Sequence, residues 1–418
     1  MNSGSVVVFI GNKQNHFAND LGTMAKDVMV PKEFSNPALL SQSATEYTID
    51  LGLKVRNFGT NSQTGATVTA TIKHNTTNIY NQTSNAFNIA NGDSAIVQFP
   101  QFSQSTYPVG KYTLTYTIHN PSSEQDTTDN VYTTDFLISD SLYSLAPLDA
   151  LTNLPITTGG TQPASFTGNY DACIAFQNSN ASRIQAEGLY FSGSTNSTDS
   201  LSGQGIVVSV YEITDVFDDL TTAPAAGSVV YLPLTQGFFT YPQGNQANMQ
   251  REMVYQPFDQ IVALENDKRY MFCAQASSQA VFIGYNTKLS YEKNVDSLLQ
   301  PLVPVITDGS VNLVGFGGDN VPALAAKVGA NTVGLAEINK IEMNAYPNPT
   351  KGNLTITIPE NGNGTVRITD VTGKEVMNAS VTFANNKSVV NTENLEAGMY
   401  IVNVIVNSKV AQTTIVKQ

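Results

Sequence analysis

Three acidic residues form the densest group of side chains that could do chemistry in this sequence. Asp215, Asp218 and Asp219 fall within five residues, and carboxylates this close together can supply oxygen ligands to a calcium ion. A polar loop, or a helix start with acidic residues near its N-terminus, would explain the same spacing. The sequence therefore predicts no cofactor, with structural calcium at this cluster as the one candidate metal.

Catalytic motifs of recognisable spacing are absent. The chain has no Gly-x-Ser-x-Gly, no His-Glu-x-x-His, no phosphate-binding or dinucleotide-binding loop and no EF-hand loop. Two carboxylates on separate strands could still hydrolyse a glycosidic bond, because such a pair leaves no local signature. The acidic residues concerned are Glu187, Glu212, Asp215, Asp218 and Asp219. We expect them to be solvated loop residues, and the chain to be non-catalytic.

The three histidines give no support to a catalytic triad. His16 falls in a polar N-terminal stretch, while His74 and His119 follow alternating strand patterns. We expect these last two residues to lie at solvated ends of strands.

The two cysteines of the chain, Cys173 and Cys273, each lie in an apolar run. In an oxidising compartment, two cysteines in one domain are candidates for a disulfide bond. Free thiols in buried strands are equally common. The separation of the two Cα atoms decides between these alternatives, and sequence spacing leaves both open.

Three aromatic residues are close together in the second half of the chain. Phe238, Phe239 and Tyr241 could form a platform on which a sugar ring stacks. Such a cluster also fits a hydrophobic core or an edge beneath a loop. The sequence therefore offers this cluster as a candidate ligand platform, for a glycan or a surface protein.

The composition limits the classes of partner. With 21 basic and 34 acidic residues the net charge is −13, and without a basic run the chain is not expected to bind nucleic acid or anionic lipid. Charged residues make up only 13% of the chain and tryptophan is absent, which is typical of extracellular β-proteins with hydroxyl-rich surfaces. No stretch is apolar for long enough to span a bilayer.

Short alternating strands must position these side chains. Between residues 19 and 140, apolar residues alternate with polar ones at Ile49 to Val55, Val68 to Ile72 and Tyr112 to Ile118. Such strands, separated by Gly, Asn and Ser turns, predict an antiparallel sandwich. The segments Leu-Lys-Val-Arg-Asn-Phe-Gly and Gly-Lys-Tyr-Thr-Leu-Thr-Tyr resemble the cell-adhesion-related (CARDB-like) Ig-like domains of bacterial surface proteins, which implies an adhesion-type module.

The rest of the chain is also predicted to be β-rich. Residues 144–317 contain several candidate strands without a helical period, which predicts a larger, jelly-roll-like sandwich. Residues 318–342 are rich in Ala, Gly, Asn and Val and are expected to form an exposed linker that can be cleaved. The predicted fold class is thus all-β, with tandem antiparallel sandwiches.

The last segment, residues 343–418, carries the most specific signal. Two prolines flank Asn348 and fit an extended entry; Leu354, Ile356 and Ile358 then alternate with threonines, as in a half-buried strand. These blocks, with Asp370 to Gly373 as a hairpin turn, resemble the type A sorting domain of the type IX secretion system of Bacteroidetes. The residues that carry this resemblance are Tyr346, Pro347, Asn348, Pro349, Gly352, Gly373, Gly398, Tyr400 and Lys417.

The resemblance implies a route rather than an activity. It implies export across the periplasm and the outer membrane by the type IX machinery, removal of the domain by its sortase, and attachment to the surface or release. Residues 1–18 show no signal peptide, so we expect them to be the remnant of a longer product. We predict a secreted or surface-attached, non-catalytic binding protein. The alternative is the accessory region of a secreted peptidase or glycosidase whose catalytic domain precedes Met1.

Overall fold

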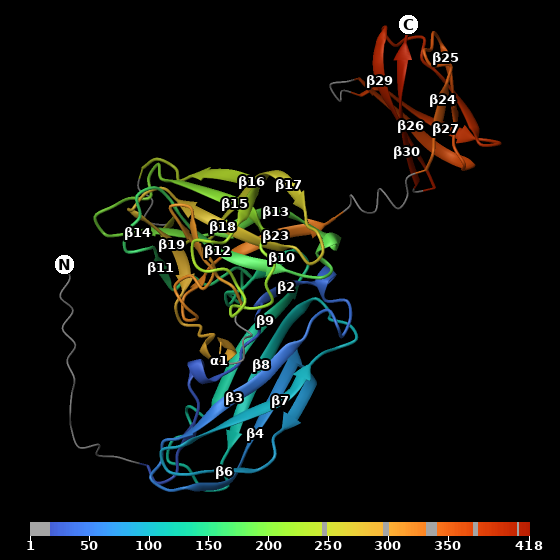
Figure 1. Ribbon diagram of the computed structural model, residues 1–418. Helices are drawn as coiled ribbons and strands as arrows, with labels where there is room; N and C mark the ends of the chain where they lie inside the picture. The colour runs from blue at the N-terminus through green and yellow to red at the C-terminus, as the bar shows by residue number, and fades with distance from the viewer. Residues whose placement is uncertain (1–16, 245–248, 296–300, 332–340, 371–374, 408) are drawn as a thin grey trace. The chain divides into compact units, whose positions relative to one another are not determined.

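The computed structural model describes residues 17–244, 249–295, 301–331, 341–370, 375–407 and 409–418. The chain divides into two compact units, Met1–Ala330 and Asn331–Gln418. Both are built from β-strands (Figure 1), and the single α-helix of the described residues is the short α1 (Glu292–Val295). The all-β prediction is confirmed. The predicted remnant, residues 1–18, lies mostly outside the described residues.

The first sandwich pairs a small sheet with part of a large one. The small sheet has the order β1 (Leu21–Gly22), β3 (Ile49–Asn57), β7 (Ser94–Phe102). The large sheet contributes β5 (Thr77–Thr83), β4 (Gln63–His74), β8 (Gly110–His119) and β9 (Val131–Ser139), with β6 (Phe87–Ile89) on β4. Leu53, Ile72 and Leu114 are fully buried between the sheets, which confirms the predicted alternation.

The large sheet does not end at the first sandwich. Beyond β9 it continues through β2 (Ser35–Pro37), β10 (Leu142–Ser144), β23 (Ala325–Ala330), β13 (Ile184–Phe191) and β17 (Val254–Ala263). The 3-10 helices η1 (Ala25–Asp27) and η2 (Ala38–Leu40) precede and follow β2 in sequence, and η3 (Ala181–Arg183) leads directly into β13. The boundary predicted at residues 140–144 therefore runs through a continuous sheet.

Buried contacts reinforce the junction. Val30 and Phe34 precede β2 in sequence but belong to the core of the middle sandwich. The side chain of Asn294, on α1, accepts a hydrogen bond from the Val30 amide (3.2 Å) and donates one to its carbonyl (3.0 Å). These satisfied buried groups help hold the two sandwiches of the first unit together.

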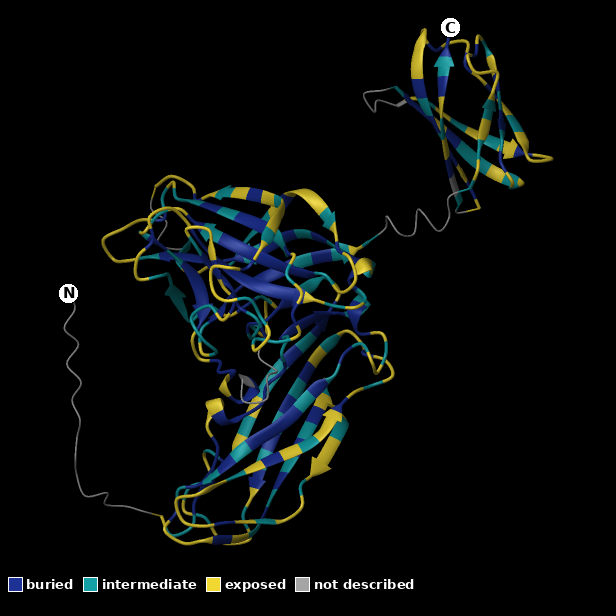
Figure 2. Cartoon of the chain, viewed as in Figure 1, coloured by how far each residue is buried: buried dark blue, intermediate teal, exposed yellow. Residues whose placement is uncertain are grey.

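A six-stranded sheet completes the middle sandwich. Its order is β16 (Tyr231–Thr240), β15 (Gly205–Ile213), β18 (Arg269–Ala276), β12 (Tyr170–Gln177), β20 (Val305–Thr307), β21 (Ser310–Asn312). A third sheet comprises β11 (Gly159–Thr161), β19 (Val281–Asn286) and β14 (Gly193–Thr195), with β22 (Val321–Pro322) on β19. The central strands β12 and β18 are almost entirely buried, as the dark blue of Figure 2 shows.

The predicted linker needs a correction. Residues 321–330, expected to be exposed, form β22 and β23, and Leu324, Ala326 and Val328 are at most 1% exposed. β23 pairs with β13 on one side and β10 on the other. A connection between the units can therefore begin only after Ala330, and residues 332–340 lie outside the described part of the chain.

The second unit is a small sandwich of its own. One sheet has the order β24 (Asn344–Tyr346), β25 (Asn353–Thr357), β28 (Lys387–Asn391), and the other β27 (Glu375–Phe383), β26 (Gly362–Asp370), β29 (Gly398–Val406), β30 (Lys409–Lys417). Leu354, Ile356 and Ile358 are buried in its core, as the alternating sequence predicts. The turn predicted at Asp370 to Gly373 falls largely outside the described residues.

Candidate functional site

One face of the paired strands β12 and β18 brings the two predicted cysteines together with polar residues that the sequence did not single out. Successive side chains of a strand point to opposite faces, so every second residue pair shares this face. The pairs along it are Asp171 with Gln275, Cys173 with Cys273, Ala175 with Met271 and Gln177 with Arg269. The middle of the face is covered by an apolar cluster that includes Phe217, Val229 and Leu313. Polar cavities border each end of the pair.

A disulfide bond joins Cys173 to Cys273 at the centre of this face. The two residues are directly opposite in the ladder, with Cα atoms 4.1 Å apart. The Cys173 amide donates a hydrogen bond to the Pro304 carbonyl, on the side of β12 away from β18. The two cysteines are therefore a non-hydrogen-bonded pair, the kind of position at which cross-strand side chains approach most closely. Both cysteines are fully buried. The structure thus contains the disulfide rather than two free thiols.

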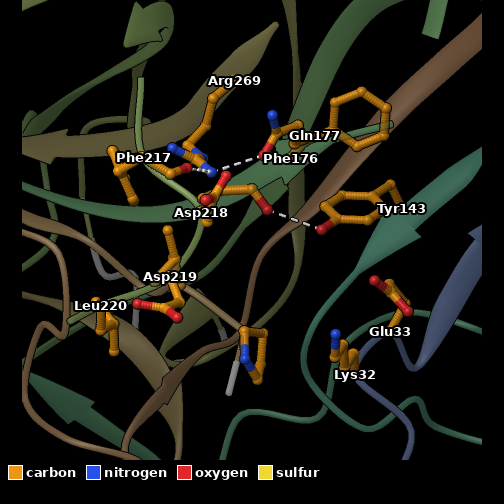
Figure 3. A pocket seen from close by; sticks show the side chains of 13 residues that line it. Lys32, Glu33, Tyr143, Phe176, Gln177, Phe217, Asp218, Asp219, Leu220 and Arg269 are labelled. Atoms are coloured by element: carbon orange, nitrogen blue, oxygen red, sulfur yellow. Dashed lines mark hydrogen bonds between the residues drawn. The ribbon is translucent and has the colours of Figure 1, made fainter. Parts of the chain in front are cut away.

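A cavity of about 330 Å³ lies at the Arg269 end of the face. Figure 3 shows Arg269 and Phe217 on one side of it and Lys32 and Glu33 on the other, with Tyr143 beside Glu33. Lys32 and Glu33 come from the segment before β2, whereas Arg269 begins β18. The cavity therefore draws on segments that are far apart in the sequence.

Arg269 is the fixed cation of this cavity. Its guanidinium donates to Gln177 Oε1 (2.7 Å) and to the Phe217 carbonyl (3.0 Å), and its Cζ lies 3.7 Å from the centre of the Phe217 ring. Burial lowers the pKa of Arg269, and the charge of Asp218 offsets part of that effect. Arginine nonetheless keeps its charge at neutral pH. Its position is thus held by hydrogen bonds and a cation–π contact.

Glu33, on the opposite side of the cavity, is an acidic residue with a shifted pKa. Burial raises the pKa of Glu33, and the neighbouring Lys32 ammonium counteracts part of the rise. The Tyr143 hydroxyl donates to the Ala175 carbonyl (2.7 Å), and burial, followed by the charge of Glu33, raises the pKa of Tyr143. The cavity therefore presents both positive and negative groups, which suits a polar ligand.

The three predicted calcium ligands do not converge. Asp215 accepts a hydrogen bond from the Val230 amide (2.6 Å), and Asp219 accepts from Thr221, whose hydroxyl and amide lower the pKa of Asp219. Asp218 and Asp219 both line the cavity of Figure 3, and Asp215 is not among its lining residues. Among the described residues there is no group of three His, Cys, Asp or Glu side chains that could hold a metal. This corrects the calcium prediction: the Asp215 and Asp219 carboxylates accept hydrogen bonds from nearby protein groups in place of a metal ion.

The other acidic candidates are not loop residues. Glu187 lies on β13 and Glu212 on β15, each in an ion pair, with Lys327 (3.7 Å) and Lys268 (3.2 Å) respectively. The expectation of solvated loop acids is therefore wrong for these two.

The two described histidines lie at strand ends as predicted, but only His119 is exposed, since His74 is half-buried against the Tyr112 ring. His74 ends β4 and His119 ends β8. Because these strands are antiparallel neighbours, the two imidazoles lie at opposite ends of the pair. His16 lies outside the described residues.

The three aromatic residues do not form one platform. Phe239 and Tyr241 point inward, with ring centroids 5.0 Å apart, and Tyr241 is fully buried. Phe238 points to the opposite face of β16 and is 64% exposed. This split follows from the two-residue repeat of a strand, so the alternation itself could have revealed it. Arg269 and Lys32, by contrast, carry no local signal that could have been read.

The residues of the predicted sorting motif gather around the C-terminal strand. The side chain of Asn348 accepts from the Val416 amide (2.8 Å) and donates to the Thr414 carbonyl (3.0 Å). Lys417 is buried and pairs with Gly398. The Gly352 carbonyl accepts from the Thr392 amide, and the Tyr400 hydroxyl donates to the Glu396 carbonyl (3.0 Å).

The remaining motif residues complete the entry to this unit. Tyr346 is 44% exposed, and the Tyr346–Pro347 and Asn348–Pro349 bonds are both cis. Gly373 lies outside the described residues. Asn348, between the two prolines, lies at the edge of β30 because of its hydrogen bonds to that strand.

Replacing Asn348 by alanine is expected to destabilise the second unit by about 1–2 kcal/mol, because it removes two hydrogen bonds to β30. Thermal unfolding of residues 341–418 would measure the effect. The exposed Asn353 serves as the matched control, and an N353A variant should unfold like the parent. Equal melting temperatures for N348A and the parent would show that the Asn348 contacts contribute nothing.

Three of the solved structures that match this chain have low TM-scores. The CARDB domain of a Pyrococcus furiosus protein, in complex with di-metal ions, is 16% identical (TM-score 0.22) and covers 32% of this chain and 99% of its own. A biofilm associated protein BSP domain is 11% identical, with a TM-score of 0.17, and the match covers 100% of this chain and 84% of that domain. The β-glucuronidase of Ruminococcus gnavus is 10% identical, with a TM-score of 0.17, and the match covers 65% of this chain and 39% of the enzyme. At these TM-scores the similarities assign no function.

Comparison with curated proteins finds no match. Within the described residues, no helix has the length and apolarity needed to cross a membrane.

A family model gives the clearest assignment. Residues 344–418 match the family described as the secretion system C-terminal sorting domain, and this is the segment in which Asn348 contacts β30. The second unit is therefore a C-terminal sorting domain of the type IX secretion system, which implies export to the cell surface or the extracellular space.

Proposed function

We propose that residues 19–330 form a non-catalytic recognition module that acts at the cell surface or outside the cell. The observation that carries this proposal is the sorting domain at residues 344–418, since its role is delivery and the first unit is the part delivered. The type IX machinery is then its partner during export. We also propose that the sortase removes the domain by cleavage after Ala330, where the last strand of the first unit ends.

The cavity of Figure 3 is the proposed contact site for a glycan or a surface protein. Arg269 is held rigidly by Gln177 and Phe217, while Lys32 and the exposed Asp218 line the same cavity. Polar groups placed on a rigid β scaffold favour recognition by hydrogen bonds and charge. The exposed ring of Phe238 is a proposed additional contact, by stacking.

A glycan and surface-protein array probed with the full chain tests this function. We expect saturable binding that weakens at least about fivefold, or roughly 1 kcal/mol, in the variants Lys32→Ala and Asp218→Asn. Chelator should leave binding unchanged, because the acidic residues do not converge on a metal site.

The exposed Asp259 lies outside the cavity, so Asp259→Asn is the matched control and should bind like the parent. Undiminished binding by both cavity variants would contradict the proposed contact site. Turnover of a probe, in place of saturable binding, would contradict the non-catalytic assignment.

A further inference from the structure

A second cavity, of about 560 Å³, lies at the opposite end of the β12–β18 pair, beyond the disulfide. Asp171 and Gln275 border it from the two strands, and Tyr211 and Tyr231 from β15 and β16. Its lining, as far as the structure describes it, includes no Lys, Arg or His residue. The cavity is therefore acidic and aromatic, unlike the cavity of Figure 3.

The Asp171 carboxylate is the unusual group of this cavity. Asp171 is 4% exposed, and no donor among the described residues reaches its buried Oδ1. Burial raises the pKa of Asp171 to about 7, and the Gln275 amide on the facing strand opposes part of this rise. A buried carboxylate without a full set of donors is costly, so a positively charged partner would be favoured here.

The other titratable groups around Asp171 keep one charge state near neutral pH. Asp308 accepts hydrogen bonds from the Thr167 amide (2.9 Å) and its neighbours, which lower the pKa of Asp308. Burial raises the pKa of Tyr211 to about 12 and also raises the pKa values of Tyr231 and Tyr170. Among these groups Asp171 alone changes charge between about pH 5 and 9.

The two tyrosines supply a second feature that favours a cation. The rings of Tyr211 and Tyr231 meet edge to face, with centroids 5.2 Å apart, and both line the cavity beside Asp171. Aromatic rings attract ammonium groups through their quadrupoles. We propose that this cavity binds the ammonium group of a ligand, a lysine side chain or an amino sugar, by pairing it with Asp171 next to the Tyr211 and Tyr231 rings.

Calorimetric titration of the full chain with small amines tests the proposal. Nα-acetyl-lysine amide and glucosamine each have an N-acetylated, neutral counterpart of similar shape. The amines should bind and their neutral counterparts should bind at least about tenfold more weakly. Whichever amine binds more tightly identifies the source of the ammonium group.

The variant Asp171→Asn keeps the shape of the side chain and should weaken amine binding at least about tenfold. Because the lysine ammonium stays charged below about pH 9, affinity for the lysine probe should fall at least about fivefold from pH 7.5 to 5.5, as Asp171 becomes protonated. Tyr231→Ala, on a partly exposed ring, should weaken binding about two- to fivefold.

Asp259→Asn is the matched control and should leave amine binding unchanged. Four results would overturn the proposal: undiminished binding to D171N, equal binding of the neutral probes, tighter binding at pH 5.5, or no binding up to about 10 mM. The Lys32 and Asp218 variants should leave amine binding intact, which keeps this test independent of the one for the cavity of Figure 3.

Discussion

Removing the disulfide between Cys173 and Cys273 is expected to lower the free energy of unfolding of the first unit by about 3–5 kcal/mol. The bond closes a loop of 100 residues, and a cross-link of that span restricts the unfolded chain by an amount worth roughly 4–5 kcal/mol in the chain-entropy description. The two sulfurs are also fully buried in an apolar cluster, so their loss adds a small cavity.

The double variant Cys173→Ala/Cys273→Ala measures this effect in urea unfolding of residues 1–330. Tyrosine fluorescence can follow unfolding, because the chain has no tryptophan. As a control, reductant should lower the midpoint of the parent after a cycle of unfolding and refolding, yet leave the double variant unaffected. An unchanged midpoint in the double variant would mean that the bond does not contribute to stability.

Alternating patterns allowed much of the fold to be predicted. Leu51, Leu53 and Val55 in the first sandwich, and Leu354 and Ile356 in the sorting domain, are buried as their two-residue repeat indicates. The repeat records which face of a strand is buried, so it succeeds wherever one face meets a core and the other meets solvent.

The composition of β23 explains why the sequence predicts a linker there. The strand runs between β13 and β10, and its Ala325 and Ala326 are fully buried. Ala and Gly make up much of this strand, and small residues are also typical of a flexible linker. Composition alone cannot separate the two cases.

The candidate cavities were not predictable for a different reason. Lys32 and Arg269 are more than 200 residues apart in sequence, and only the packing of two different sheets brings their segments to one cavity. Asp171 gave no signal either, since it precedes an apolar run and reads as an ordinary strand residue. Sites assembled from distant strands leave no local pattern to read.

A chain that ends at Asn320 is expected not to fold, whereas one that ends at Ala330 should. The ten residues between them form β22 and β23 and bury Val321, Leu324 and Val328 almost completely. Each of these side chains contributes about 1.5–3 kcal/mol when buried, so their loss is comparable with the whole stability of a typical domain, about 5–15 kcal/mol.

The loss of β23 also leaves two strands unpaired on one side. β13 and β10 would each present an unpaired edge in the middle of the large sheet, and exposed edges promote aggregation.

Size-exclusion chromatography and circular dichroism of the two truncated chains should show a folded monomer for 1–330 and aggregated or unfolded protein for 1–320. Adding a ten-residue Gly/Ser tail to 1–320 controls for length and should not restore folding, because the tail brings back none of the buried Val and Leu side chains. A cooperative melt of 1–320 at the temperature of 1–330 would instead place residues 321–330 outside the folding unit, and the linker would then begin at Gly318, as the sequence predicts.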